Sequence, residues 1–290
     1  MAADSLVYLN GQFLPMAEAR VPVMDRGFLF GDSVYEVIPV YGGHLFRLDH
    51  HLDRLDNSLA AIEMANPVSR PAWKDLLGRL VAQRPGEDQS VYLQVTRGPA
   101  EKRDHAIPPM VSPTVFAMTN PLAPIDPAVA EQGIAAITLP DLRWLRCDIK
   151  ATTLLANVLA RQRAKEQGAM EAILLRDGLA LEGAASNLFV VKGGLLVTPP
   201  KSENVLPGIT RDLVLELAEA NGIPHAEAAI PEGDLGVAEE IWLTSSTREV
   251  MPVTRLDGRP VAGGRPGALW RRMNGLYQAY KARARQGVDA

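Results

Sequence analysis

The residue that points most directly to chemistry is Lys150, which ends the run Arg146-Cys147-Asp148-Ile149-Lys150. The run leads from a strand-like segment into a helix with an apolar stripe, so Lys150 alone among the seven lysines is expected to be buried. An apolar pocket lowers the pKa of a lysine, and the neutral amine can form a Schiff base with an aldehyde or ketone. On this segment alone, an ordinary exposed lysine at a helix start is the simpler explanation.

An aldehyde cofactor with a phosphate group would need an anion site, and three segments could supply one. Gly208 precedes Ile209 and Thr210 at an expected helix start capped by Thr210, where backbone amides attract anions. The hydroxyl run Thr244-Ser245-Ser246-Thr247 follows a buried strand, and Arg54 on a helix flank would add a formal positive charge. Each feature alone also has a structural explanation: a helix cap, a polar loop or a surface arginine.

A pyridine cofactor would also need an anion beside its ring nitrogen, because the protonated ring accepts electrons from the substrate. Glu182 is the candidate. It ends the strand Leu179-Ala180-Leu181 just before Gly183, so its carboxylate could face a site at the end of a sheet. An exposed glutamate at a strand end explains the sequence equally well.

Composition excludes several classes of protein. A chain of 290 residues predicts two domains, and 47% hydrophobic with 22% charged residues is ordinary for a globular protein. No apolar run reaches the length of a membrane span, and a net charge of −4 gives no reason to expect a nucleic-acid partner. The start, Met1-Ala2-Ala3-Asp4-Ser5, lacks the features of a signal peptide.

Cysteine and histidine content predicts neither a disulfide nor a metal site. Cys147 is the single cysteine, which fits a reducing cytoplasm and excludes both an internal disulfide and a cysteine-based zinc site. His50 and His51 are adjacent and would point about 100° apart on a helix, so a solvated helix face is expected there.

The pattern of apolar and turn residues predicts a mixed α/β (α+β) chain with many hairpins and no regular strand-helix alternation. The prolines at 121, 124 and 127 indicate a linker over 121–127 between domains 1–120 and 128–290. Strands are expected at 6–9, from 12, and at 34–41, 90–97, 134–139, 172–175, 179–181, 188–191, 195–197 and 241–243, with helices at 45–62, 71–83, 152–168 and 210–222.

Several motifs, in order along nearly the whole chain, resemble the fold-type IV pyridoxal-phosphate enzymes, which include the class IV aminotransferases. They are Asp25-Arg26-Gly27, Gly31-Asp32-Ser33-Val34-Tyr35-Glu36, Arg143-Trp144-Leu145-Arg146-Cys147-Asp148-Ile149-Lys150, Leu181-Glu182-Gly183, Ser186-Asn187-Leu188-Phe189 and Gly208-Ile209-Thr210-Arg211. The resemblance is closest to the D-amino acid aminotransferases. It implies a two-domain fold with pyridoxal 5′-phosphate at the domain interface, and a homodimer.

The resemblance also implies roles for single residues. Lys150 would be the Schiff-base lysine and would carry the proton between the substrate and the cofactor. Glu182 would pair with the pyridine nitrogen, and Leu206 would pack against the ring. The phosphate would be held by Arg54, Ile209, Thr210 and Ser246, with Thr247 as a further cofactor-binding residue.

The loop Glu101-Lys102-Arg103-Asp104-His105 bears on the substrate. Residues two apart on an extended loop project to one side, so Arg103 and His105 can converge on a carboxylate. D-amino acid aminotransferases are similar, with an Arg-x-His pair that reaches in from the neighbouring subunit and, with a tyrosine matching Tyr35, holds the α-carboxylate. Branched-chain enzymes lack this pair. A solvated charged loop is the alternative.

The expected reaction is ping-pong transamination of D-alanine with 2-oxoglutarate, giving pyruvate and D-glutamate. A branched-chain L-amino acid aminotransferase, an aminodeoxychorismate-type lyase, an (R)-amine aminotransferase and a non-catalytic binding protein are the alternatives. Departures from the family pattern are Ala184-Ala185, Pro207, Ser246 and a loop over 97–103 one residue longer. Amino acids and 2-oxo acids are the expected partners, in the cytoplasm, without nucleic acid or membrane.

Overall fold

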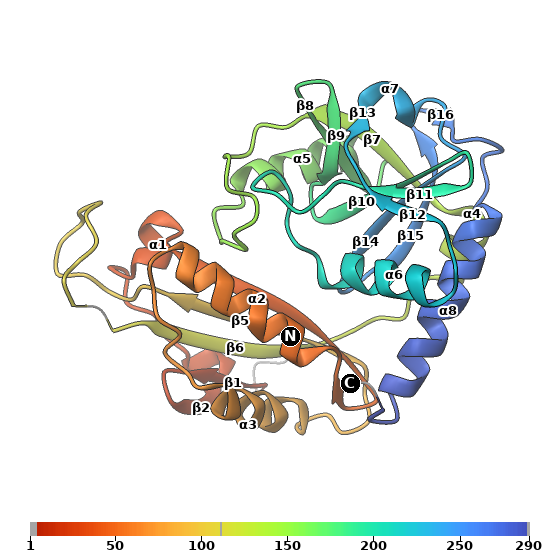
Figure 1. Ribbon diagram of the computed structural model, residues 1–290. Helices are drawn as coiled ribbons and strands as arrows, with labels where there is room; N and C mark the ends of the chain where they lie inside the picture. Colours follow the sequence, from red (N-terminus) through yellow and green to blue (C-terminus); the bar gives the residue numbers. More distant parts are fainter. Residues whose placement is uncertain (1–4, 111, 289–290) are drawn as a thin grey trace. The chain divides into compact units, whose positions relative to one another are not determined.

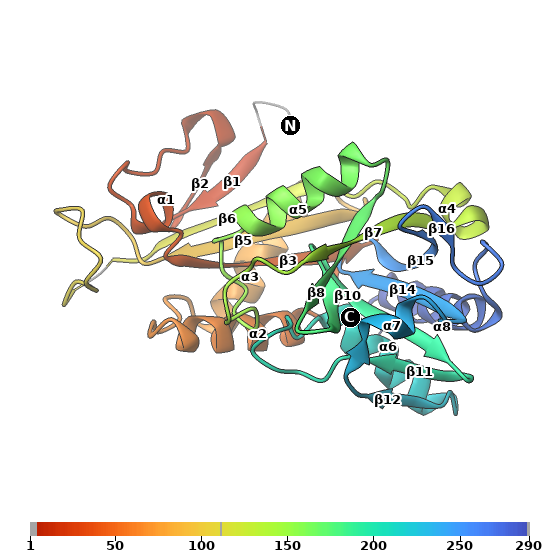
Figure 2. The ribbon, with the colours of Figure 1, turned by 90° about the horizontal axis from the view of Figure 1, so that it is seen from above.

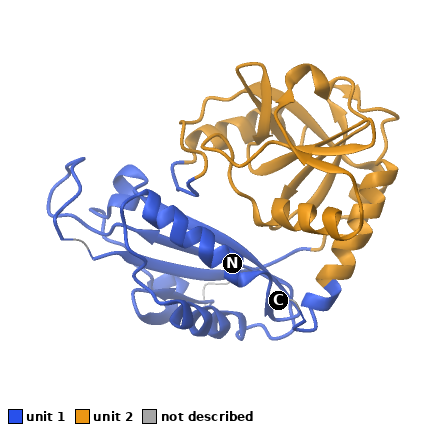
Figure 3. Cartoon of the chain, in the orientation of Figure 1, with its two compact units in different colours: residues 1–123, 149–153, 282–290 blue, residues 124–148, 154–281 orange. Residues whose placement is uncertain are grey.

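A computed structural model describes residues 5–110 and 112–288 of the chain. The chain forms two compact units, and each is described by itself (Figure 3). Unit 1 comprises 1–123, 149–153 and 282–290, and unit 2 comprises 124–148 and 154–281. The expected division into domains 1–120 and 128–290 stays a prediction. Met1 to Asp4, part of the segment without signal-peptide features, lie outside the described residues.

Unit 1 contains a six-stranded antiparallel sheet with the strand order β2-β1-β6-β5-β3-β4 (Figure 1). The expected opening hairpin is confirmed. Its turn residues Asn10 and Gly11 have φ of 47° and 93°, the conformation that a tight two-residue hairpin requires. The strands are β1 (Leu6–Leu9), β2 (Gln12–Pro15), β3 (Ser33–Tyr41), β4 (His44–Leu45), β5 (Gln89–Thr96) and β6 (Thr114–Pro121).

The helices of unit 1 are α1 (Arg26–Phe30), α2 (Leu48–Ala61) and α3 (Arg70–Val81). Helices α2 and α3 share one apolar core with strands β3, β5 and β6, because their leucines recur at helical spacing and face the sheet. Ile149 and Ala151 belong to the same core, although they come from the middle of the chain. The segment 149–153 is therefore anchored in unit 1 by its own apolar side chains.

Unit 2 is built on a ten-stranded sheet with the order β12-β11-β10-β14-β15-β7-β8-β9-β13 and β16 beside β15. Strand β9 also pairs with β10, so six of the strands, from β10 through β14, β15, β7 and β8 to β9, close into a ring. The strands are β7 (Ile134–Pro140), β8 (Glu171–Arg176), β9 (Leu179–Gly183), β10 (Ser186–Lys192), β11 (Leu195–Thr198), β12 (His225–Glu227), β13 (Ile230–Pro231), β14 (Glu240–Ser245), β15 (Glu249–Leu256) and β16 (Arg259–Pro260).

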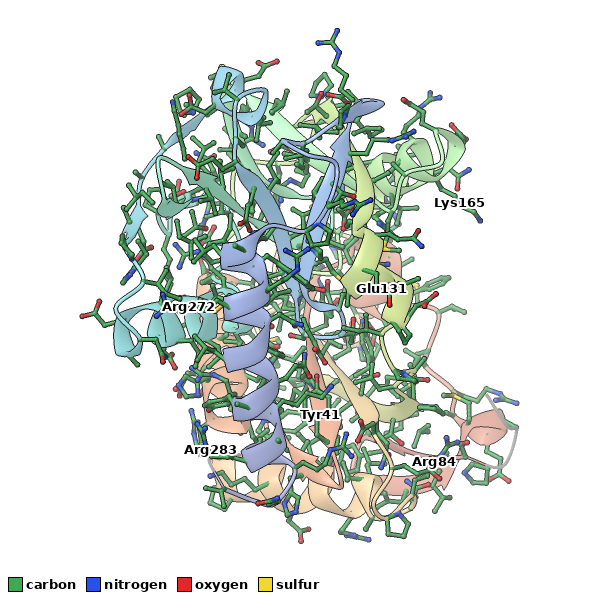
Figure 4. The ribbon with its side chains drawn as sticks, turned by 90° about the vertical axis from the view of Figure 1, so that its right-hand side faces the viewer. Tyr41, Arg84, Glu131, Lys165, Arg272 and Arg283 are labelled. Carbon is green, nitrogen blue, oxygen red and sulfur yellow. The ribbon has the colours of Figure 1, made fainter. Side chains whose placement is uncertain are left out.

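The remaining helices are α4 (Pro127–Gln132), α5 (Leu155–Glu166), α6 (Ile209–Ala220), α7 (Glu232–Leu235) and α8 (Ala268–Ala284). Helix α5 packs on β7 and β8, with Ala164 against Ala172 (Figures 1 and 2). Helix α8 was not expected from the sequence. Its Arg272, labelled in Figure 4, donates from Nη2 to the carbonyl oxygen of Asn221 at 2.7 Å. Within the described ranges, no helix combines the length and apolarity needed to cross a membrane.

Candidate active site

The backbone of the Lys150 segment is hydrogen bonded to the start of strand β3. The amide of Tyr35 donates to the carbonyl oxygen of Lys150 at 2.9 Å, and the amide of Thr152 donates to that of Ser33 at 3.1 Å. An isolated β-bridge joins Val34 to the segment between these two bonds. Lys150 is thus held like a short extra strand at one end of the sheet.

The side chain of Lys150 is only half-buried, which corrects the expectation of a fully buried lysine. Its Nζ lies 4.3 Å from the centroid of the Tyr35 ring. The Lys150 amide donates to Ser58 Oγ on helix α2 at 3.3 Å. Lys281 is half-buried too, so burial alone does not single out Lys150. What distinguishes Lys150 is its fixed backbone and its contact with an aromatic face.

Beside this segment, Glu36 forms a buried ion pair with two residues of helix α2. Arg54 donates to both Glu36 oxygens at 2.7 Å, and His51 Nδ1 lies 2.7 Å from Oε2. Burial would raise the pKa of Glu36, but Arg54 and His51 outweigh it and lower this pKa to about 2. His51 is fully buried, so the expected solvated face is wrong for it. Arg54 is likewise buried rather than on a surface flank.

The side chains of Arg103 and His105 each lie near the ring of Phe30, and their expected convergence on a carboxylate stays a prediction. The guanidinium carbon of Arg103 lies 5.0 Å from the centroid of this ring, and the His105 ring centroid lies 5.2 Å from it. Arg26 Nη1 donates to the carbonyl oxygen of Asp104 at 2.6 Å, and Nη2 donates to that of His105 at 3.1 Å. The loop is therefore tied to helix α1, while Arg103 and His105 stay exposed.

In unit 2, Glu182 is a buried carboxylate with several donors. The amide of Leu206 and Asn187 Nδ2 each donate to Oε2 at 3.0 Å, and Arg143 Nη1 makes a short contact with Oε1. Burial raises the pKa of Glu182 to about 7, although Arg143 opposes the rise. Arg143 is itself held by Asp141, with Nη2 2.9 Å from Oδ2. An additional positive charge beside this carboxylate would favour its ionised form.

The pairing of the strands places Glu182 and Thr244, the first residue of the hydroxyl run, on either side of Asn187. Asn187 on β10 pairs with Glu182 on β9 and with Thr244 on β14. Thr244 Oγ1 is buried and, among the described residues, has no hydrogen-bond partner. Ser246 and Thr247 lie in the half-exposed turn that follows. A phosphate bound at this edge could accept a hydrogen bond from the Thr244 hydroxyl.

The start of helix α6 lies beside the same asparagine. Gly208 is the N-cap, without a side-chain cap, so the expectation that Thr210 caps this helix is wrong. A Cβ on Gly208 would lie 1.8 Å from Asn187 Oδ1, so only glycine fits this close approach. Ile209 and Thr210 are buried in the first turn, where amides favour an anion.

The structure thus collects the expected residues into two groups. Unit 1 carries Tyr35, Arg54 and Lys150 at one end of its sheet, with the Arg103 loop tied to helix α1. Unit 2 carries the residues expected at the ring and the phosphate, which are Glu182, Leu206, Ile209, Thr210, Ser246 and Thr247.

Four residues at the site were not expected from the sequence: Glu36, His51, Arg143 and Asn187. A signal was present for Glu36, because it is a charged residue inside a strand expected to be buried on both faces, and such a charge needs a partner. Arg143 and Asn187 lie within the quoted motifs, but their contacts depend on strand pairing that the sequence does not display.

Comparison with known proteins identifies the family to which the chain belongs. Residues 33–256 match the model of the family described as amino-transferase class IV. A D-alanine aminotransferase of Bacillus licheniformis is 43% identical over 94% of this chain and 95% of its own length. The crystal structure of a branched-chain amino acid aminotransferase from Escherichia coli superposes with a TM-score of 0.89 at 28% identity, covering 95% of this chain and 94% of that one.

A third similar protein is a hypothetical aminotransferase from Mycobacterium tuberculosis in a form bound to pyridoxal phosphate. It has a TM-score of 0.83 and 25% identity, covering 94% of this chain and 98% of that one. The resemblance to fold-type IV enzymes and the expected α/β fold class are both confirmed. The chain belongs to the class IV aminotransferase family.

Proposed function

We propose that the protein is a D-amino acid aminotransferase that exchanges the amino group of D-alanine with 2-oxoglutarate. The substrate assignment rests on Arg103 and His105, which lie on one loop and each approach the Phe30 ring. A guanidinium and an imidazole on the same loop suit the α-carboxylate of an amino acid. D-alanine aminotransferases among the relatives support the expected D-amino acid transamination.

The cofactor is pyridoxal 5′-phosphate, as expected from the sequence. When bound, it supplies an aldehyde and a ring that accepts electrons. Lys150 Nζ would bind the aldehyde and then move the proton to and from the α-carbon of the substrate. The Tyr35 face beside this Nζ and the fixed backbone on either side would restrict where the amine can reach.

The residues of unit 2 would bind and orient the same cofactor. Glu182 would face the ring nitrogen, because burial raises its pKa and a positive charge beside it would favour the ionised carboxylate. Leu206, whose amide contacts Glu182, would lie against the ring. Ile209 and Thr210 of helix α6, Ser246 and Thr247 would hold the phosphate. Arg54 would contribute charge there, oriented by its two bonds to Glu36.

We propose a homodimer on the basis of the apolar surface of helix α5. Leu155 is 71% exposed, and Val158 and Leu159 are each 58% exposed, although the sequence gives them the spacing of a buried face. An exposed apolar stripe of this kind marks an interaction surface. A cytoplasmic location is proposed because Cys147 is a free, buried thiol, which fits a reducing compartment.

A branched-chain aminotransferase remains the second candidate, because the Escherichia coli enzyme has a similar fold. Sequence identity favours the first proposal, since the Bacillus licheniformis relative reaches 43% and the branched-chain structure 28%. The fold is shared by both activities, so the substrate has to be decided at the loop carrying Arg103.

The proposed stereospecificity predicts faster turnover of D-alanine than of L-leucine, each with 2-oxoglutarate as acceptor. The purified protein should also absorb visible light, and Lys150→Ala should abolish both the absorbance and the turnover. Coupled assays of the 2-oxo acid products measure both rates. Faster L-leucine turnover would support the branched-chain alternative, and a colourless protein inert to both would indicate a binding protein. Elimination of pyruvate without an acceptor would indicate a lyase.

The role of Arg103 predicts that Arg103→Ala raises KM for D-alanine by about ten- to a hundredfold, because a charge-assisted bond to the α-carboxylate is lost. Lys102→Ala is the matched control, since the Lys102 side chain on the same loop is 82% exposed. Steady-state kinetics with both variants measure the change. An unaltered KM in Arg103→Ala would remove this residue from the substrate site.

Arg143 is expected to hold the pKa of Glu182 below the value that burial alone would give. Arg143→Gln should raise the pKa of Glu182 further above about 7, because burial would then act with less opposition. A raised pKa leaves more Glu182 protonated at pH 7, so the acid limb of the kcat/KM profile should move to higher pH. Arg143→Lys keeps the positive charge, so its acid limb should lie between those of the wild type and Arg143→Gln. Arg146→Gln, whose side chain is 40% exposed, is the control. A uniform loss at every pH would contradict the electrostatic role.

A further inference from the structure

The loop that carries Arg103 and His105 is held by one buried guanidinium. Arg26 on helix α1 is 4% exposed, and it donates to the backbone carbonyl oxygens of three consecutive loop residues. Its Nη1 donates to Asp104 at 2.6 Å and to Ala106 at 3.2 Å, and its Nη2 donates to His105 at 3.1 Å. Carbonyl oxygens that face one point repel one another unless a cation lies between them, so this loop conformation depends on Arg26.

Asp32 orients the guanidinium of Arg26. The Oδ2 atom of Asp32 accepts from Arg26 Nε and from Arg97 Nε, each at 2.8 Å. Burial would raise the pKa of Asp32, but the bonds from Arg97 and Arg26 outweigh it and lower this pKa, so the carboxylate is ionised at neutral pH. Because the guanidinium is planar and rigid, the bond at Nε directs both Nη groups toward the loop.

Helix α1, which carries Arg26, is itself fixed to the sheet of unit 1. Its N-cap residue Asp25 accepts from Thr96 Oγ1 at 3.0 Å and from Thr114 Oγ1 at 2.6 Å, at the end of β5 and the start of β6. Phe30 lies one helical turn after Arg26, and the Arg26 guanidinium carbon is 5.0 Å from the centroid of its ring. Arg26 therefore connects the loop to a part of the sheet that has a fixed position.

The loop has few other means of holding one conformation. Residues 101–107 are all exposed, so burial of their side chains contributes little to their order. The loop projects beyond helix α1 (Figure 1). The bonds from Arg26 therefore contribute much of the order of this segment.

We infer that Arg26 and Asp32 are positioning residues, which set the affinity for the substrate without touching it. This role rests on the proposed function, in which Arg103 and His105 bind the α-carboxylate. Side chains on a loop with many conformations would lose more entropy on binding than side chains on a loop that Arg26 already holds. Every amino acid and 2-oxo acid has this carboxylate, so loss of the restraint weakens the binding of the amino donor and of the acceptor alike.

Arg26→Gln should raise KM for D-alanine and KM for 2-oxoglutarate by about tenfold each and leave kcat within about threefold, because uniform binding of the carboxylate is lost. Asp32→Asn should act in the same direction. Arg26→Lys should retain part of the affinity, since an ammonium keeps the charge but lacks the planar fork. Arg20→Gln is the matched control, because Arg20 is an exposed arginine that donates to the carbonyl oxygens of Ala17 and Ala19.

A double-mutant cycle shows whether Arg26 acts through the loop. When Arg103→Ala is already present, Arg26→Gln should raise KM by at most about threefold, because one of the two side chains that it positions is gone. The same factor in both backgrounds, an unchanged KM for both substrates, or a loss of kcat alone would overturn the positioning role. Arg26→Lys still decides the question if Arg26→Gln fails to fold.

Limited proteolysis of the holoprotein with trypsin follows the loop without any measurement of activity. The Lys102 side chain is 82% exposed, and Arg26→Gln should speed cleavage after it by about tenfold, because the released loop fits the protease more often. Cleavage after Lys192, whose side chain is 52% exposed at a turn of unit 2, should not change, which separates release of the loop from general unfolding.

Unaltered cleavage after Lys102 in both Arg26→Gln and Asp32→Asn would show that these residues do not hold the loop. A wild-type enzyme that does not react with D-alanine would instead contradict the proposed function. In that case the cleavage rates would still decide whether Arg26 and Asp32 fix the loop.

Discussion

The attachment of residues 149–153 to strand β3 is the constraint on which the chemistry proposed for Lys150 depends. Ile149 and Ala151 are buried in the core of unit 1, and they point away from the side of the segment that carries the lysine. The backbone bond from Tyr35 to Lys150 fixes the residue between them. A lysine on a flexible segment would lose conformational entropy when it bound a cofactor. The backbone of residues 149–153 is already ordered by folding, so binding costs less entropy.

Two buried glutamates show how the surroundings of a carboxylate determine its use. Arg54 and His51 both bind the carboxylate of Glu36 and lower its pKa to about 2. Glu36 therefore orients these two side chains and is not expected to bind another cation. Glu182 is equally buried, yet its pKa rises to about 7 because Arg143 offsets only part of the cost of burial. The first carboxylate supports the structure around Arg54, and the second would, in the proposed function, stabilise a positive charge on the cofactor.

Local patterns predicted strands β1 to β3, β5, β7 to β11 and β14, three hairpins and helices α2, α3 and α5, because turn residues and apolar spacing determine these elements directly. Strands β4, β6, β12, β13, β15 and β16 were not expected. The turn at Asn10-Gly11 and the strand around Val34 to Tyr41 are examples. Helix α8 was missed, since its many polar residues obscure the face that carries the buried Trp270 and Met273. The partners of the site residues could not be predicted either. They depend on pairings between strands far apart in sequence, which no local pattern encodes.

Lys150 is the amine proposed to bind the cofactor. The most direct measurement is reduction of the holoprotein with borohydride, followed by proteolysis and mass spectrometry of the peptides. A pyridoxyl-phosphate adduct is expected on the peptide that contains Lys150 and on no other lysine peptide. An adduct on Lys281, the other half-buried lysine, or no adduct on any lysine would contradict it.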